Sequence, residues 1–152
     1  MMNTEKWHHR YLELAEHVSH WSKDPSSKIG AVAVGEFGQI LSTGFNGFPR
    51  GISDTEDRLH NREEKYKHVI HAEMNVIYNA SLTGISLRGA TLYVYGLPIC
   101  SNCALGIIQA GINTVVIPRV IASLQTSRWL ESWKQSKALF DEAGIEVIFI
   151  DI

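Results

Sequence analysis

The sequence predicts an α/β fold, a three-layer α/β/α sandwich built on one mixed five-stranded sheet. An amphipathic helix opens the chain, an apolar hairpin follows it, and strands then alternate with helices to the end. This alternation is typical of a sheet that carries helices on both faces. The chain has 152 residues, of which 45% are hydrophobic and 20% are charged. That length and balance predict a single domain over residues 1–152 with a core of its own.

The first helix is predicted from apolar residues at helical spacing, which are Trp7, Tyr11, Leu14, Ala15, Val18 and Trp21. Asp24-Pro25 ends this helix, because the residue before a proline is disfavoured in the α region. Residues 29–34 are apolar on both alternating faces, which indicates a buried strand. Residues 39–45 are predicted as a second strand, and the short glycine-containing link favours an antiparallel hairpin.

The remainder of the chain, after a loop at 46–51, alternates between the two kinds of element. The predicted elements are a helix over 69–82, a strand over 90–95, a helix over 100–110, a strand over 113–117, a helix within 127–144 and a strand over 146–150. In the last helix Trp129 and Trp133 share a face at i, i+4 spacing. We expect both to contact the core, together with Leu139 and Phe140.

Residues 54–67 are dense in charges of both signs. A segment of this kind is typically a solvated helix or loop, which is the favoured interpretation. A role in closing over a substrate or in assembly is the alternative.

Composition narrows the classes of partner and compartment. The net charge of −2 counts against a protein that binds nucleic acid through its phosphates, although it leaves room for a small anionic substrate. No apolar run approaches the ~20 residues of a membrane span. The spacing of the 2 cysteines does not suggest a disulfide, and no secretory signal peptide is evident. These features predict a cytoplasmic protein.

Two motifs carry the chemistry, His71-Ala72-Glu73 and the pair of cysteines Cys100 and Cys103. If a helix starts near Cys100, the two cysteines lie one turn apart and their sulfurs can converge. A helix N-terminus offers free N–H groups and a positive dipole end, which stabilise thiolates. His71, near the start of another helix, can complete a set of three ligands. Three protein ligands leave one tetrahedral position for water, the pattern of a catalytic zinc.

Glu73 constrains where such a site lies. Side chains two residues apart point to nearly opposite sides of an ideal helix, so His71 and Glu73 cannot meet beside it. They can meet beyond its N-terminal end. Since two thiolates weaken zinc as an acid for its water, a nearby carboxylate that accepts the proton becomes more important, and Glu73 suits that role.

Other interpretations of these residues remain open at this point. The two cysteines could form a redox pair, although the His-x-Glu motif would then have no purpose. A structural zinc would need a fourth ligand that another histidine could supply, and His68 could replace His71. We read the other histidines, His8, His9, His17, His20 and His60, as residues without catalytic duty.

H-x-E followed by P-C-x-x-C is the signature of zinc deaminases, and the chain is a near match to it. The wider sequence resembles the deoxycytidylate (dCMP) deaminase branch of the cytidine deaminase superfamily, from about Trp7 to Ile117. The stretches that carry the resemblance are 22–25 (SKDP), 29–32 (IGAV), 44–51 (GFNGFPRG), 71–75 (HAEMN), 103–104 (CA) and 107–112 (IIQAGI).

The resemblance implies a cytidine deaminase-like fold and a specific reaction. A zinc-activated water attacks C4 of cytosine, Glu73 moves the proton from that water to N3 and then helps to protonate the departing amine, and dCMP becomes dUMP and ammonia. The backbone N–H of Ala72 would hold the carbonyl of the base, and Asn46 would contact the nucleoside. For Asn46 the simpler alternative is a turn residue of an Asn-Gly pair.

The resemblance also suggests where the phosphate binds. Ser22 and Lys23 are the expected contacts, with Arg50 or Lys28 assisting, because a hydroxyl plus a cation suits a phosphate. For Arg50 and Lys28 a solvated surface charge is an equally good interpretation.

Some features of the chain depart from the family pattern. Ile99 stands between Pro98 and the first zinc cysteine, where the family commonly has proline next to cysteine, so the pocket wall is expected to differ there. No cysteine remains for a second, structural zinc, so one Zn²⁺ per subunit is expected. The segment 51–55 lacks the cysteine-containing acidic sequence of members that respond to dCTP, so such regulation is open. The resemblance further implies a homo-oligomer, a dimer or hexamer.

Three functions compete on this basis. The leading hypothesis is dCMP deamination in pyrimidine nucleotide metabolism. A rival with the same chemistry deaminates another cytosine nucleoside or base, or adenosine in tRNA. The low pI and the lack of a basic stripe count against tRNA. A rival of another class is a catalytically silent zinc-binding module, which would have no need of Glu73.

Overall fold

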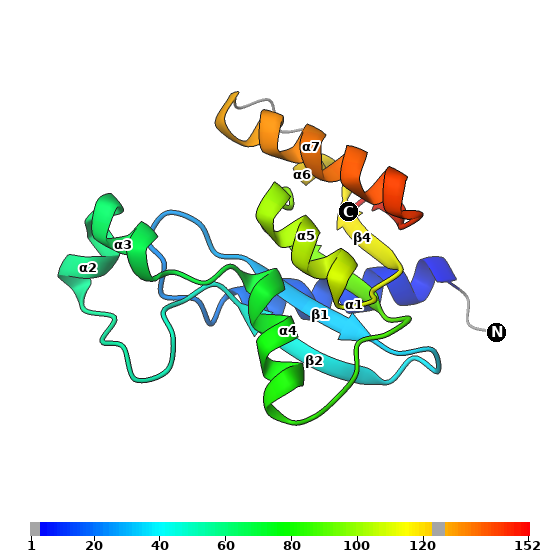
Figure 1. Ribbon diagram of the computed structural model, residues 1–152, viewed down its shortest axis with the longest axis horizontal. Helices are drawn as coiled ribbons and strands as arrows, with labels where there is room; N and C mark the ends of the chain where they lie inside the picture. The colour runs from blue at the N-terminus through cyan, green and yellow to red at the C-terminus, as the bar shows by residue number, and fades with distance from the viewer. Residues whose placement is uncertain (1–3, 123–126) are drawn as a thin grey trace.

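Five strands form one mixed sheet at the centre of the molecule, in the order β2-β1-β3-β4-β5 (Figure 1). The computed structural model describes residues 4–122 and 127–152. The strands are β1 (Gly30–Val34), β2 (Ile40–Phe45), β3 (Thr91–Tyr95), β4 (Thr114–Pro118) and β5 (Glu146–Ile150). β1 runs antiparallel to β2 and β3, whereas β3, β4 and β5 run parallel. The predicted hairpin and the mixed five-stranded sheet are confirmed.

Helices cover both faces of this sheet, as a three-layer sandwich requires. On one face lies α1 (Thr4–Ser19), and on the other lie α4 (Ala72–Leu82), α5 (Ser101–Gln109) and α7 (Ser127–Ala143). The strands supply both cores because their side chains alternate between faces. Along β4, Val115 and Ile117 pack in the core beneath α4, α5 and α7, while Val116 packs beneath α1. None of the helices in the described ranges is long and apolar enough to cross a membrane.

The charged segment 54–67 forms two short helices, α2 (Glu56–His60) and α3 (Arg62–His68). Asn61 lies between them and caps both helices. It is the C-cap of α2 and the N-cap of α3, where its side chain accepts a hydrogen bond from the N–H of Glu64. A further short helix, α6 (Arg119–Ala122), was not predicted.

The helix predicted over 69–82 begins three residues later than expected. Val69 ends α3, and Ile70 forms an isolated antiparallel bridge with Gly47, in which each N–H donates to the other residue's C=O. Residues 69–71 are therefore extended, and α4 starts at Ala72 with His71 as its N-cap. The expected boundary was wrong because this bridge joins segments that are distant in sequence.

α4 packs against the edge strand β2 at backbone distance. A Cβ atom on Gly44 would lie 2.6 Å from the backbone nitrogen of Val76, so only glycine fits at this position. Hydrogen bonds of 2.8 Å hold the contact: Ser42 Oγ donates to the C=O of Val76, and the Asn75 and Asn79 side chains donate to C=O groups of β2. The start of α4 is thereby fixed relative to the sheet.

We predict that Gly44→Ala pushes α4 away from β2. Because overpacked positions typically lose about 1–3 kcal/mol, the free energy of unfolding should fall by that amount in chemical denaturation. Gly47→Ala is the matched control, since its Cβ would approach nothing closer than a Phe45 ring atom at 3.9 Å. Equal stabilities of the two variants would contradict the close approach of α4 to the strand.

Candidate metal centre and adjoining cavity

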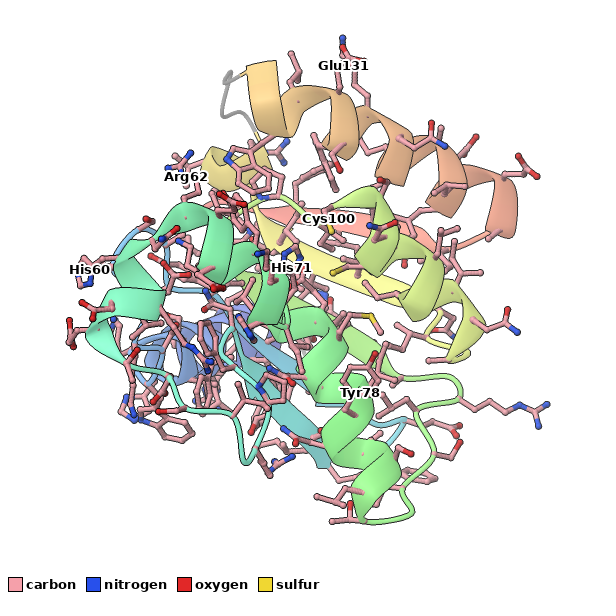
Figure 2. All side chains as sticks on the ribbon, turned by 60° about the vertical axis from the view of Figure 1, so that its left-hand side comes forward. His60, Arg62, His71, Tyr78, Cys100 and Glu131 are labelled. Atoms are coloured by element: carbon pink, nitrogen blue, oxygen red, sulfur yellow. The ribbon has the colours of Figure 1, made fainter. Side chains whose placement is uncertain are left out.

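Three side chains from two helix starts converge on one point. His71 Nδ1 lies 3.3 Å from Cys100 Sγ and 3.4 Å from Cys103 Sγ, and the three ligand atoms all lie within 4.8 Å of one another. Figure 2 shows His71 and Cys100 close together, and each is the N-cap residue directly before its helix, α4 and α5 respectively. Tetrahedral zinc with ordinary bond lengths would place a nitrogen and a sulfur ligand about 3.6 Å apart. The triad therefore fits zinc and leaves a fourth position open.

The ends of the two helices prepare these ligands for a metal. Cys100 is the N-cap of α5, and its sulfur accepts a hydrogen bond from the N–H of Cys103 at 3.4 Å. The backbone N–H of Met74, in the first turn of α4, bonds the Cys103 sulfur. Hydrogen bonds from Cys103 and His71 lower the pKa of the Cys100 thiol to about 4. Each sulfur thus has an N–H donor. Beside Cys100 and in its buried position, the Cys103 thiol nevertheless has a pKa well above its ordinary value, so Cys100 is the sulfur whose surroundings favour the thiolate, the form that binds metal.

Glu73 is the second residue of α4 and lies beside this triad. Its side chain is buried, with 4% of its surface exposed, and it lines the adjoining cavity. Burial raises the pKa of the Glu73 carboxyl to about 7. A carboxyl with that pKa can both take up and release a proton near neutral pH. The site lies off the N-terminal ends of α4 and α5, which is the placement that the His-x-Glu spacing requires.

The cavity next to the triad has a volume of about 160 Å³. Its walls come from the loop at 24–29, from α3, from the loop before Cys100 and from α7. The residues that line it, besides the triad's His71 and Cys100 and the neighbouring Ala72 and Glu73, are Asp24, Ser26, Ser27, Ile29, Asn46, Arg62, Lys65, Tyr66, Val69, Leu97, Pro98 and Trp129.

A buried ion pair joins two of these walls. Lys65 Nζ of α3 lies 3.1 Å from Asp24 Oδ1, and both side chains are less than a tenth exposed. The same oxygen accepts hydrogen bonds from the N–H groups of Ser26 and Ser27, at 2.8 and 3.2 Å. This carboxylate therefore ties α3 to the loop that follows α1.

Two predicted substrate contacts do line the cavity. Ala72 is the first residue of α4, where a backbone N–H has no partner within the helix. Asn46 is buried, and its side chain is bonded at both ends: Oδ1 accepts from the N–H of Ile29 at 2.9 Å, and Nδ2 donates to the C=O of Ser27 at 2.8 Å. Asn46 therefore holds the cavity loop in place.

The four predicted phosphate contacts are not among the residues that line this cavity. Ser22 is buried and donates to the C=O of Asn46, and Lys28 Nζ donates to the C=O of Ser22. Arg50 bonds Asn79 at 2.7 Å on the surface. Lys23 pairs with Asp54 at 3.1 Å and lines a second cavity of about 230 Å³.

Sequence reasoning missed the contributions of α3 and α7 to the cavity. Arg62, Lys65 and Tyr66 lie at i, i+3 and i+4, which puts them on one side of a helix, and this spacing was the available signal. Trp133 is buried in the core as expected, but Trp129 lines the cavity.

Ile99 is fully buried, and its C=O accepts a hydrogen bond from Ser136 of α7 at 2.8 Å. The residue that departs from the family pattern therefore anchors the ligand loop.

Comparison with known proteins places this chain. Residues 5–118 match the family described as the cytidine and deoxycytidylate deaminase zinc-binding region. The chain belongs to this family. Zinc is accordingly its cofactor, and the triad of His71, Cys100 and Cys103 is positioned to hold it.

Similar proteins span nearly the whole of this deaminase. An uncharacterized deaminase of Aliivibrio fischeri is 42% identical over 147 residues, which cover 97% of this chain and 95% of that protein. A deoxycytidylate deaminase of Pongo abelii is 33% identical over 147 residues, covering 92% and 77%. The crystal structure of a dCMP deaminase from the cyanophage S-TIM5, in complex with dCMP and dUMP, superposes with a TM-score of 0.71 at 27% identity and covers 97% of each chain.

We predict that Lys65→Met strongly destabilises this deaminase. The substitution leaves the Asp24 carboxylate buried without its counter-ion, a change that typically costs about 3–5 kcal/mol of unfolding free energy. Lys23→Met is the matched control, because its pair with Asp54 is solvent-exposed and worth at most about 1 kcal/mol. Urea denaturation measures both, and similar losses in the two variants would argue against the buried pair.

Proposed function

We propose that this deaminase converts dCMP and water to dUMP and ammonia. The observation that carries the proposal is a buried carboxyl, Glu73, beside a three-ligand zinc site that opens on a cavity. The deoxycytidylate deaminases among its relatives support dCMP as the substrate, as does the similar structure that contains dCMP and dUMP.

In this reaction the C4–N bond of cytosine breaks, a carbonyl forms at C4, and one water is consumed. Zinc at the triad would activate that water for attack. Glu73 takes one proton from this water and passes it to N3 of the ring. It then takes the second proton of the same water and passes it to the departing amine, which leaves as ammonia. The carboxyl can act as base and then as acid because burial holds its pKa at about 7.

Backbone groups at the start of α4 orient the base. The N–H of Ala72 donates to the carbonyl oxygen of cytosine, so that C4 faces Glu73 and the metal ligands. Asn46 acts by holding residues 27–29, because both ends of its amide bond that segment. Trp129 and Pro98 supply apolar wall.

An ammonia-release assay tests the substrate. The purified protein is supplied in turn with dCMP, CMP, dCTP, deoxycytidine, cytosine, guanine and a tRNA. We expect the highest kcat/KM on dCMP. A higher value on a nucleoside, a free base or tRNA adenosine would assign the same chemistry to that substrate. No turnover on any of them, with zinc bound, would favour a silent zinc-binding module.

We predict that Glu73→Gln retains zinc but loses nearly all turnover. An amide cannot take up the proton, and loss of a general acid–base group typically lowers kcat by about 10²- to 10⁴-fold. Steady-state kinetics and metal analysis measure the two quantities. Glu142→Gln, at an exposed site on α7, is the control and should match wild type. Substantial activity in Glu73→Gln would remove Glu73 from the proton transfer.

We also propose that the chain forms a homo-oligomer. Three exposed apolar side chains, Tyr78 and Leu82 of α4 and Leu105 of α5, support this because each is at least half exposed in the single chain. Light scattering should therefore give a mass that is a multiple of 17.0 kDa. A mass of one chain at micromolar concentration would contradict the proposal.

A further inference from the structure

A nucleotide substrate requires a binding site for its 5′-phosphate, and the geometry restricts where this lies. When C4 of the base faces Glu73 and the metal ligands, the phosphate occupies the far end of the same cavity. Its partners must line that cavity away from the triad. Ser22, Lys28 and Arg50 do not line it, and each has a polar partner elsewhere.

Among the residues that the structure describes, two cations line this cavity, Lys65 and Arg62. Lys65 is buried against Asp24, so that pair contributes little net charge. Arg62 takes part in none of the ion pairs or hydrogen bonds of the described side chains, and it is exposed. Figure 2 shows it at the start of α3, apart from His71 and Cys100. Arg62 therefore supplies a positive charge on the α3 wall of the cavity, with no ion-pair partner among the described residues.

Two hydroxyl groups on the loop at 24–29 line the same cavity. Ser26 and Ser27 follow Pro25, and their N–H groups are held by the Asp24 carboxylate. Within the described ranges, neither hydroxyl makes a side-chain hydrogen bond, so both can donate to a ligand. Lys65 of α3 donates a hydrogen bond to the same carboxylate, so Asp24 holds the loop at 24–29 against α3. A planar guanidinium and two hydroxyls are groups that recognise a phosphate.

We propose that Arg62, Ser26 and Ser27 bind the 5′-phosphate of the nucleotide substrate and so determine the preference for a nucleotide over a nucleoside. This inference rests on the proposed function. The hydroxyl contacts are then Ser26 and Ser27 in place of the predicted Ser22 and Lys23. The charged partner is Arg62, on the second helix of the charged segment, α3.

The second cavity provides the rival assignment. It contains Lys23, but that side chain is 69% exposed and paired with Asp54, so an anion there would compete with a carboxylate already in place. The second cavity also contains neither metal ligands nor Glu73. A nucleotide with its base at the triad fits the first cavity better.

The test compares kcat/KM for dCMP and deoxycytidine in Arg62→Gln. We expect a loss of about 10- to 100-fold on dCMP, the range typical of a lost hydrogen bond between charged groups, and little change on deoxycytidine. Arg62→Lys should recover part of the preference. If deoxycytidine turns over too slowly, the ratio of inhibition constants for deoxyuridine and dUMP replaces it, and should fall towards one in Arg62→Gln. Ser26→Ala with Ser27→Ala should act in the same direction.

Lys67→Gln is the matched control, since Lys67 is an exposed cation on the same helix that lines neither cavity. It corrects for the long-range effect of removing one positive charge. Equal losses on dCMP and deoxycytidine in Arg62→Gln would overturn the assignment, as would a dCMP-specific loss in Lys23→Gln alone. Wild-type protein that does not deaminate dCMP would instead refute the proposed function, independently of any variant.

Discussion

The convergence of two helix N-termini at one point is the constraint on which the rest of the structure depends. A helix start carries N–H groups that have no partner within the helix, and here they face sulfur atoms, a carboxyl group and a cavity. The sheet order brings this about: α4 lies against β2 and β1, α5 follows β3, and β1 lies between β2 and β3. His71 and Cys100 can therefore occupy equivalent N-cap positions and turn their side chains towards each other.

Much of the fold could be predicted because its signals are local. The apolar run at 29–34 and the turn that follows it specify the hairpin without reference to the rest of the chain, and the alternation of later elements specifies the layers. The start of α4 was predicted too early because the pairing of Ile70 with Gly47 lies outside any local pattern. The helix α6 could not be predicted because four residues are too few to show the helical spacing of apolar side chains.

The site likewise has a part that local sequence motifs predict and a part that depends on contacts between distant segments. The triad and Glu73 stand in short motifs whose spacing already specifies the chemistry, so they could be chosen from the sequence. The cavity is assembled from α3, α7 and two loops, and no window of sequence contains it. Ser22 and Lys23 have suitable side chains for a phosphate, but folding turns the Ser22 hydroxyl towards Asn46 and leaves Lys23 on the surface. The charged segment is mostly exposed, as interpreted, and it also provides a wall of the cavity through Arg62 and Lys65.

The hydrogen bonds from Asn75 and Asn79 to β2 have a consequence outside the site. β2 lies at the edge of the sheet, where unpaired C=O groups can template the addition of a strand from another chain. The two asparagines cap the C=O groups of Phe45 and Thr43 along that edge. The helix whose N-cap is the metal ligand His71 thus also covers the sheet edge and opposes aggregation there. Detachment of α4 would leave the C=O groups of the edge strand β2 unpaired and would separate His71 from the two cysteines. Loss of solubility and loss of the metal site would therefore occur together.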